Sequence, residues 1–167
     1  MSTVVLAGTG SAGQVFRSTD GGQSWSLVDR LGSAQSVYAL ADLDGGVVLA
    51  GTYPNAEVYR STDGGQSWSL AQQLGSENMV YSLADLGGGV VLAGTGPNGQ
   101  VYRSTDGGQS WSLVQRLGSE ERVQSLAYLG GGVVLAGTGP NGQVYRSTDG
   151  GQSWSRVQQL VAGASGG

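Results

Sequence analysis

The stretch Ser18-Thr19-Asp20-Gly21-Gly22-Gln23-Ser24-Trp25 occurs four times in the chain, and the other copies cover residues 61–68, 104–111 and 147–154. The tryptophans that close these copies are 43 residues apart. A constant period of this length is typical of a protein in which one supersecondary unit stacks on copies of itself. The repeat therefore decides the fold, and every other motif is placed relative to it.

The third copy shows which secondary structure the repeat encodes. Runs rich in β-branched and aromatic residues cover 90–95, 100–104, 111–117 and 123–129, and Gly, Pro, Asn and Asp separate them. Such short runs between turn residues predict β-strands. No stretch keeps apolar residues at helical spacing over the length of a helix. We therefore expect an all-β protein with four short antiparallel strands in each unit.

Each residue type in the repeated stretch has its own expected structural role. Asp106 can accept hydrogen bonds from backbone N–H groups of the turn that follows it. Gly107 and Gly108 allow positive φ at little steric cost. Trp111 begins the next strand, where its ring is expected to lie between adjacent sheets. The residues with such structural roles are Ser18, Asp20, Gly22, Trp25, Ser61, Asp63, Gly65, Trp68, Ser104, Asp106, Gly108, Trp111, Ser147, Asp149, Gly151 and Trp154.

The pattern Ser-x-Asp-x-Gly-x-x-Trp resembles the Asp-box, or BNR repeat, of sialidase-like and sortilin-like propellers and of photosystem II assembly factors. The resemblance covers nearly the whole chain and implies a β-propeller of four-stranded antiparallel blades, with four blades in the chain. It also implies that residues 123–129 form an innermost strand and residues 111–117 an outermost one. A β-solenoid is the less favoured alternative, because its rungs are shorter and need no tryptophan-bearing hairpin.

The period divides residues 1–160 into four propeller repeats, approximately 4–46, 47–89, 90–132 and 133–160, the last of them truncated. Residues 161–167 lack the inner-strand pattern and are expected to form a flexible C-terminal tail. The inner-strand pattern thus occurs three times and the other strand patterns four times.

An open arc of blades would leave blade faces and a strand edge exposed to water. We expect self-association to close the ring, most simply as a head-to-tail pair of chains with eight blades. A four-bladed monomer, another stoichiometry and a fragment of a longer array are the alternatives.

The composition argues against several function classes. The chain has 167 residues, a net charge of −4 and no histidine, cysteine or lysine. The usual general base, thiol nucleophile, Schiff-base amine and zinc ligands are missing, so we expect no enzymatic activity, metal or cofactor. The lack of a basic cluster argues against nucleic acid and membrane partners. No signal-peptide or transmembrane pattern is recognised, so the localisation is left open, with the cytoplasm as the default.

A ligand site is expected, by the same resemblance, on the rim opposite the Asp-boxes. That rim would carry Tyr53, Asn55, Asn98 and Asn141, with Ser76, Glu77, Asn78, Glu120, Glu121 and Arg122 beside them. Amides and hydroxyls repeated in this way could bind glycans or peptides. The simpler interpretation is that Pro-Asn-Gly provides turn chemistry.

Two further sets of charged residues can be interpreted either as functional or as structural. The arginines that precede each Asp-box are similar to the arginine triad of sialidases, but their equivalent positions favour stem packing and pairing with a carboxylate. They are Arg17, Arg60, Arg103 and Arg146. A single aspartate in each turn supplies too few oxygens for calcium.

The uniformity of the repeats indicates recent amplification of one blade, or engineering from one blade. It favours a non-enzymatic, self-assembling repeat scaffold without a dedicated ligand. A multivalent lectin-like or protein-interaction propeller is the alternative, and a sialidase-like glycoside hydrolase is a remote one.

Overall fold

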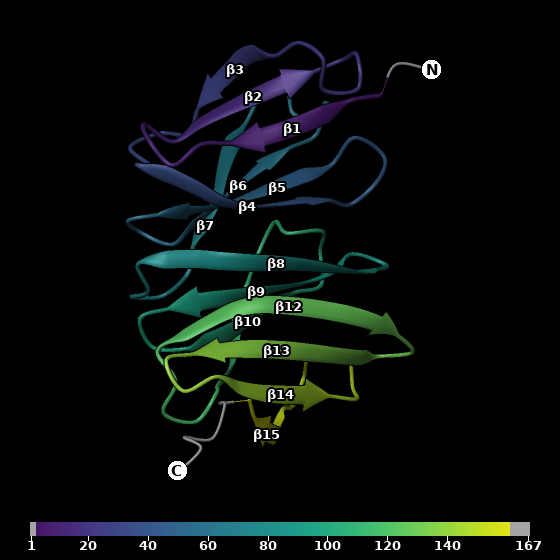
Figure 1. The fold of residues 1–167 in the computed structure, drawn as a ribbon. Helices are drawn as coiled ribbons and strands as arrows, with labels where there is room; N and C mark the ends of the chain where they lie inside the picture. The colour runs from purple at the N-terminus through teal and green to yellow at the C-terminus, as the bar shows by residue number, and fades with distance from the viewer. Residues whose placement is uncertain (1–2, 161–167) are drawn as a thin grey trace, which may run out of the picture.

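The computed structural model describes residues 3–160, so the tail expected at 161–167 lies outside the described residues. Four antiparallel sheets follow one another along the chain (Figure 1). The all-β fold class with blade-like sheets is confirmed. In residues 3–160 no helix has the length and apolar character to cross a membrane.

Each sheet is a meander whose strands follow chain order. The first sheet has three strands, β1 (Val5–Gly8), β2 (Gln14–Ser18) and β3 (Ser26–Arg30). The second contains β4 (Ser36–Asp42), β5 (Val48–Tyr53), β6 (Glu57–Ser61) and β7 (Ser69–Gln73). The third contains β8 (Met79–Gly87), β9 (Val90–Gly96), β10 (Gln100–Ser104) and β11 (Ser112–Arg116). The fourth contains β12 (Arg122–Gly130), β13 (Val133–Gly139), β14 (Gln143–Ser147) and β15 (Ser155–Gln159).

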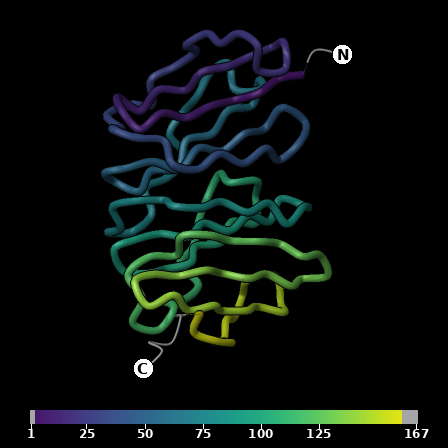
Figure 2. The backbone as a smooth tube through the Cα atoms, in the orientation of Figure 1, coloured from purple at the N-terminus to yellow at the C-terminus, as the bar shows by residue number. Residues whose placement is uncertain are grey.

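The first strands of the three complete sheets, β4, β8 and β12, contact one another in succession. They form the inner edge of the arc, as expected for residues 123–129, and β7, β11 and β15 are at the opposite edges of their sheets. Each sequence repeat therefore supplies three strands to one sheet and the inner strand to the next. The first and last sheets lie at opposite ends of the arc (Figures 1 and 2).

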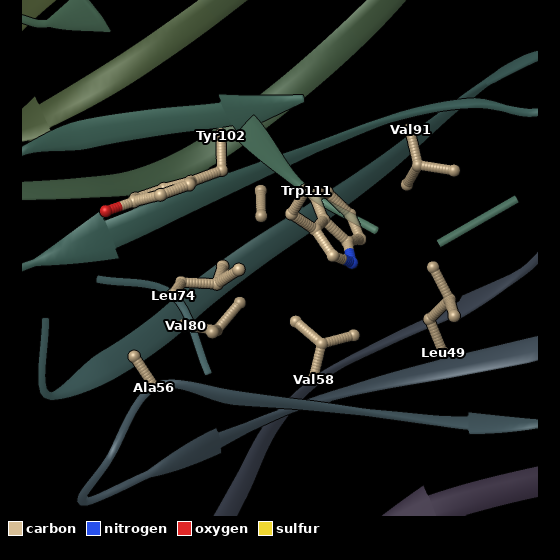
Figure 3. Close-up of a cluster of buried hydrophobic side chains, with 9 residues drawn as sticks. Leu49, Ala56, Val58, Leu74, Val80, Val91, Tyr102 and Trp111 are labelled. Atoms are coloured by element: carbon tan, nitrogen blue, oxygen red, sulfur yellow. The ribbon is translucent and has the colours of Figure 1, made fainter. Parts of the chain in front are cut away.

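The core consists of three apolar clusters, one between each pair of consecutive sheets. Between the second and third sheets, Trp111 packs with Leu49 and Val58 of the preceding sheet (Figure 3). Apolar side chains on the facing sides of consecutive sheets pack together in this way. The apolar packing that stabilises the fold is therefore located at the joints between consecutive sheets.

The four indoles are not equally buried. Trp111 and Trp154 are only 6% and 7% exposed, and Trp68 is half-buried. Trp25 is 41% exposed, because no other sheet of residues 3–160 packs in front of the first one. The expectation that every indole lies between sheets is therefore wrong for Trp25, and its reason is the position of the first sheet at the end of the arc.

Backbone hydrogen bonds assign the turns to two rims. At one rim the Asp-box turn bonds to the glycine turn of its own sheet, as Gly107 N does to Gly89 O at 2.9 Å. At the other rim the Pro-Asn-Gly turn bonds to the following loop, as Gly99 N does to Glu121 O at 2.9 Å. The two kinds of turn therefore lie at opposite ends of the strands, as expected.

Candidate functional site

The Asp-box turn is built around one carboxylate. Ser110 N donates to Asp106 Oδ1 at 2.9 Å, and Ser104 Oγ donates to the same oxygen at 2.8 Å. Ser110 Oγ donates to Asp106 Oδ2. The turn needs left-handed backbone at Gly107 and Gly108, whose φ values are 69° and 84°. Finally, Trp111 Nε1 donates to Gly108 O at 3.0 Å, which fixes the indole against its own turn.

These hydrogen bonds stabilise the charged form of each aspartate. The serine hydroxyl four residues later is the largest cause, followed by its backbone N–H, and together they lower the pKa of Asp106 and of Asp149 to about 2. The equivalent serines, Ser24 and Ser67, hold the pKa of Asp20 and Asp63 well below the usual range. Because the pKa of all four aspartates is lowered in the folded state, each aspartate stabilises the fold at pH values above its unfolded-state pKa. This stabilisation is lost as the pH falls toward the folded-state pKa.

We expect acid to weaken the fold between about pH 4 and pH 2, where the unfolded aspartates bind protons first. Asp106→Asn should lower stability at neutral pH and reduce this acid-dependent loss, because one of the depressed carboxylates is gone. Urea midpoints at neutral pH and at the acid end of that range measure both effects. An unchanged acid-dependent loss in Asp106→Asn would contradict the carboxylate's role.

A recurring set of contacts joins each sheet to the next. At the joint between the second and third sheets, Arg60 Nε donates to Gly107 O at 2.9 Å. Gln72 bonds to the backbone of Trp111 twice, from Nε2 to O at 3.0 Å and from Trp111 N to Oε1 at 2.9 Å. A Cβ on Gly108 would lie 2.6 Å from the Leu49 side chain, so only glycine permits this approach. We call these contacts the joining set.

The other joints repeat the arginine contact of the joining set, and the last joint repeats the glutamine contacts too, whereas Asp29 occupies the Gln72 position at the first joint. Arg17 Nε donates to Gly64 O at 3.0 Å and Arg103 Nε donates to Gly150 O at 3.0 Å. Gln115 bonds to the backbone of Trp154 as Gln72 does to Trp111. The expectation that these arginines pair with a carboxylate is wrong for Arg17, Arg60 and Arg103, whose Nε atoms bond to a glycine carbonyl of the next Asp-box. The geometry nevertheless gives the arginines the structural role.

Each end of the arc carries one half of the joining set. On the outer face of the fourth sheet, Arg146 and Gln158 are exposed and Leu135 is half-buried, whereas Leu49 and Leu92 at the same position of earlier sheets are fully buried. On the outer face of the first sheet, the Asp-box turn and Trp25 are exposed. The fourth sheet therefore presents the arginine half and the first sheet presents the tryptophan half.

The rim opposite the Asp-boxes contains two buried carboxylates. Glu77 is 1% exposed and accepts from Thr95 Oγ1 at 2.9 Å, from Asn98 N at 3.2 Å and from Asn98 Nδ2 at 2.5 Å. Glu120, which is fully buried, makes the same bonds to Thr138 and Asn141. These glutamates were expected on an open rim, and that expectation is wrong because each carboxylate is buried and bonds to the threonine and asparagine of the following sheet.

The four proposed ligand-rim residues thus have different surroundings. Asn98 and Asn141 direct their amides to the buried glutamates, and Asn55 is half-buried. Tyr53 lines a shallow pocket of about 240 Å³ together with Tyr81 and Arg122. Among residues 3–160, the buried Arg122 Nε atom has no hydrogen-bond partner. Within residues 3–160 no three His, Cys, Asp or Glu side chains gather closely enough to hold a metal ion.

The geometry defines a protein of propeller blades held together by Asp-box turns. The family model described as BNR/Asp-box repeat matches residues 16–27, 59–70, 102–113 and 145–156. Together with the sheet topology, these four repeats assign the chain to the Asp-box, or BNR, repeat β-propeller family.

Solved structures share this fold. An ancestral GH74 enzyme is 25% identical with a TM-score of 0.74, over 96% of this chain and 24% of that one. The GH74 xyloglucanase from Xanthomonas campestris is 19% identical with a TM-score of 0.72, over 98% of this chain and 30% of that one. YCF48 from Cyanidioschyzon merolae is 18% identical with a TM-score of 0.65, over 91% of this chain and 53% of that one. No curated protein matches the sequence.

Proposed function

We propose that the chain is a non-enzymatic, self-assembling propeller scaffold without a dedicated ligand. Copies join head to tail, most simply as two chains that together contribute eight blades. The observation that carries this proposal is the complementarity of the two ends of the arc, which present opposite halves of a contact set that already joins the sheets inside the chain.

The end faces favour association because they expose apolar side chains to water. Leu129 and Val157 of the fourth sheet are 61% and 57% exposed, whereas Leu86 and Val114 at the same positions of the third sheet pack against a core cluster. Trp25 offers the ring that this face lacks. A joint between unlike faces is heterologous, so it forms a closed ring when the rotation permits and a filament otherwise.

The side chains available for chemistry support a non-enzymatic role. The Asp-box carboxylates are engaged in their turns, and Glu77 and Glu120 are buried and hydrogen-bonded. A hydrolase would need an accessible acid and a second carboxylate or nucleophile in one cleft. The chain spans only about a quarter of the ancestral GH74 enzyme, and about a third of the xyloglucanase. Turnover of xyloglucan or of a fluorogenic sialoside would overturn this part of the proposal.

A lectin-like or peptide-binding propeller is the second candidate. The pocket with Tyr53, Tyr81 and the unpartnered Arg122 Nε favours it, since rings and a guanidinium suit sugars and carboxylates. A structure of YCF48 bound to D1 peptide has a TM-score of 0.54 at 18% identity, over 89% of this chain and 76% of that one. A glycan array and a peptide array, each repeated with Arg122→Ala, test this candidate.

Light scattering behind size-exclusion chromatography tests the scaffold. At micromolar concentration we expect the mass of two chains for the unchanged protein and of one chain for Leu135→Asp, which puts a charge on the outer face of the fourth sheet. Leu113→Asp is the matched control, because Leu113 is already 52% exposed on an internal sheet. A compact monomer for the unchanged protein would contradict self-association.

A further inference from the structure

Among residues 3–160, strand β1 has a free edge that its counterparts lack. It pairs only with β2, whereas β5, β9 and β13 each pair with a strand on both sides. Val5 and Leu6 are accordingly half-buried, while Val91 and Leu92 at the same positions of β9 are fully buried. An unpaired edge presents a row of backbone N–H and C=O groups that another strand can bind.

A cavity lies beside this edge, at the joint between the first and second sheets. Its volume is about 530 Å³ and its lining includes Val5, Leu6, Leu40, Asp42 and Val48. Apolar side chains thus form part of the wall, and the β1 backbone forms its border.

At the joint between the second and third sheets, a leucine side chain fills part of the equivalent space. The counterpart cavity there is about 210 Å³ and is lined by Leu43, Val47, Asp85 and the following glycines. Leu43 follows the inner strand β4 of the second sheet and packs into the cluster at that joint together with Leu83. Within the described part of the chain, the first sheet has no inner strand and so no such leucine. The larger cavity therefore lies where the second leucine of an inner strand would pack.

Beyond the scaffold role, which itself needs no ligand, we propose that the free edge of β1 binds an extended peptide that adds to the first sheet as an antiparallel fourth strand. Main-chain hydrogen bonds to β1 supply affinity, and a leucine side chain that enters the cavity supplies specificity. The chain's own inner strands define the peptide, because all three carry two leucines three residues apart, Leu40 and Leu43, Leu83 and Leu86, Leu126 and Leu129.

The existing sheets also define the register. In the third sheet Leu83 is opposite Ala93, Ala84 is opposite Leu92 and Asp85 is opposite Val91. One repeat period relates β9 to β5 and two periods relate it to β1, so the bound peptide would place the same residues opposite Ala7, Leu6 and Val5. The second leucine of the peptide then enters the cavity beside Leu40. This inference does not depend on self-association, because no strand within residues 3–160 of the same chain pairs with that edge.

The experiment uses a fluorescein-labelled peptide with the sequence of residues 78–88 and follows its anisotropy as the protein is added. We expect saturable binding, weakened about tenfold or more in the peptide that carries Leu86→Ser, because that leucine no longer fills the cavity. Equal binding of the two peptides, or no binding, would overturn the proposal.

Two protein variants complete the test. In the first, the sequence of residues 78–88 is placed directly ahead of Thr3, which continues the repeat period and supplies the strand within the chain. We expect this variant to unfold at higher urea concentration and to bind no peptide; retained binding would place the peptide elsewhere and refute the proposal. In the second, residues 161–167 are removed. If the peptide binds only after this removal, residues 161–167 themselves occupy the edge of β1, and the proposal is wrong.

Discussion

Trp111→Ala is expected to lower the free energy of unfolding by about 3–5 kcal/mol, the range for removing a buried aromatic ring from a packed core. The indole is 6% exposed and packs with Leu49 and Val58 across the joint between two sheets. Its removal leaves a cavity where two sheets meet, together with a carbonyl of Gly108 that has lost its donor. The loss is large because the ring belongs to a joint and not to one sheet.

Trp25→Ala is the matched control, since the same residue type occupies the same turn without a sheet in front of it. We expect a loss of about 1 kcal/mol for this exposed ring in the single chain. Urea unfolding at submicromolar concentration, where association is weakest, measures both variants. Equal losses would contradict the claim that the indole acts through the neighbouring sheet.

The buried glutamate of the opposite rim gives the second large effect. Glu120→Ala should cost about 2–3 kcal/mol, because donors of Thr138 and Asn141 lose their buried acceptor. Glu121→Ala is the control, because its side chain is exposed and it should change stability by no more than about 0.5 kcal/mol. Comparable urea midpoints for the two variants would show that the carboxylate of Glu120 does not hold the loop.

Most of the sheet architecture could be predicted from the repeat alone. The 43-residue period and the turn residues located the strands of each sheet, and the side chain of Asp106 could be assigned to its turn from the chemistry of aspartate. The local signals were sufficient because every repeat carries the same ones. The inner strands β4, β8 and β12 were also visible as a pattern.

Features that depend on neighbouring sheets were harder to predict. Strand direction places Glu77 and Glu120 on the rim opposite the Asp-boxes, and their burial was not expected because glutamate is rarely buried. Their constant spacing of 21 residues to Asn98 and Asn141 was the available signal, but only the fold shows that the side chains meet. The exposure of Trp25 likewise follows from its place at the end of the arc, which its local sequence does not encode.

The matching faces at the two ends of the arc are the basis of the proposed assembly, and a mixing experiment tests them most directly. Trp25→Asp alters only the first sheet's outer face, and Leu135→Asp alters only that of the fourth. Native mass spectrometry of each variant alone should give one chain. An equal mixture should give a pair with one copy of each, because one unaltered face of each kind remains. Pairs in either variant alone, or none in the mixture, would contradict head-to-tail joining.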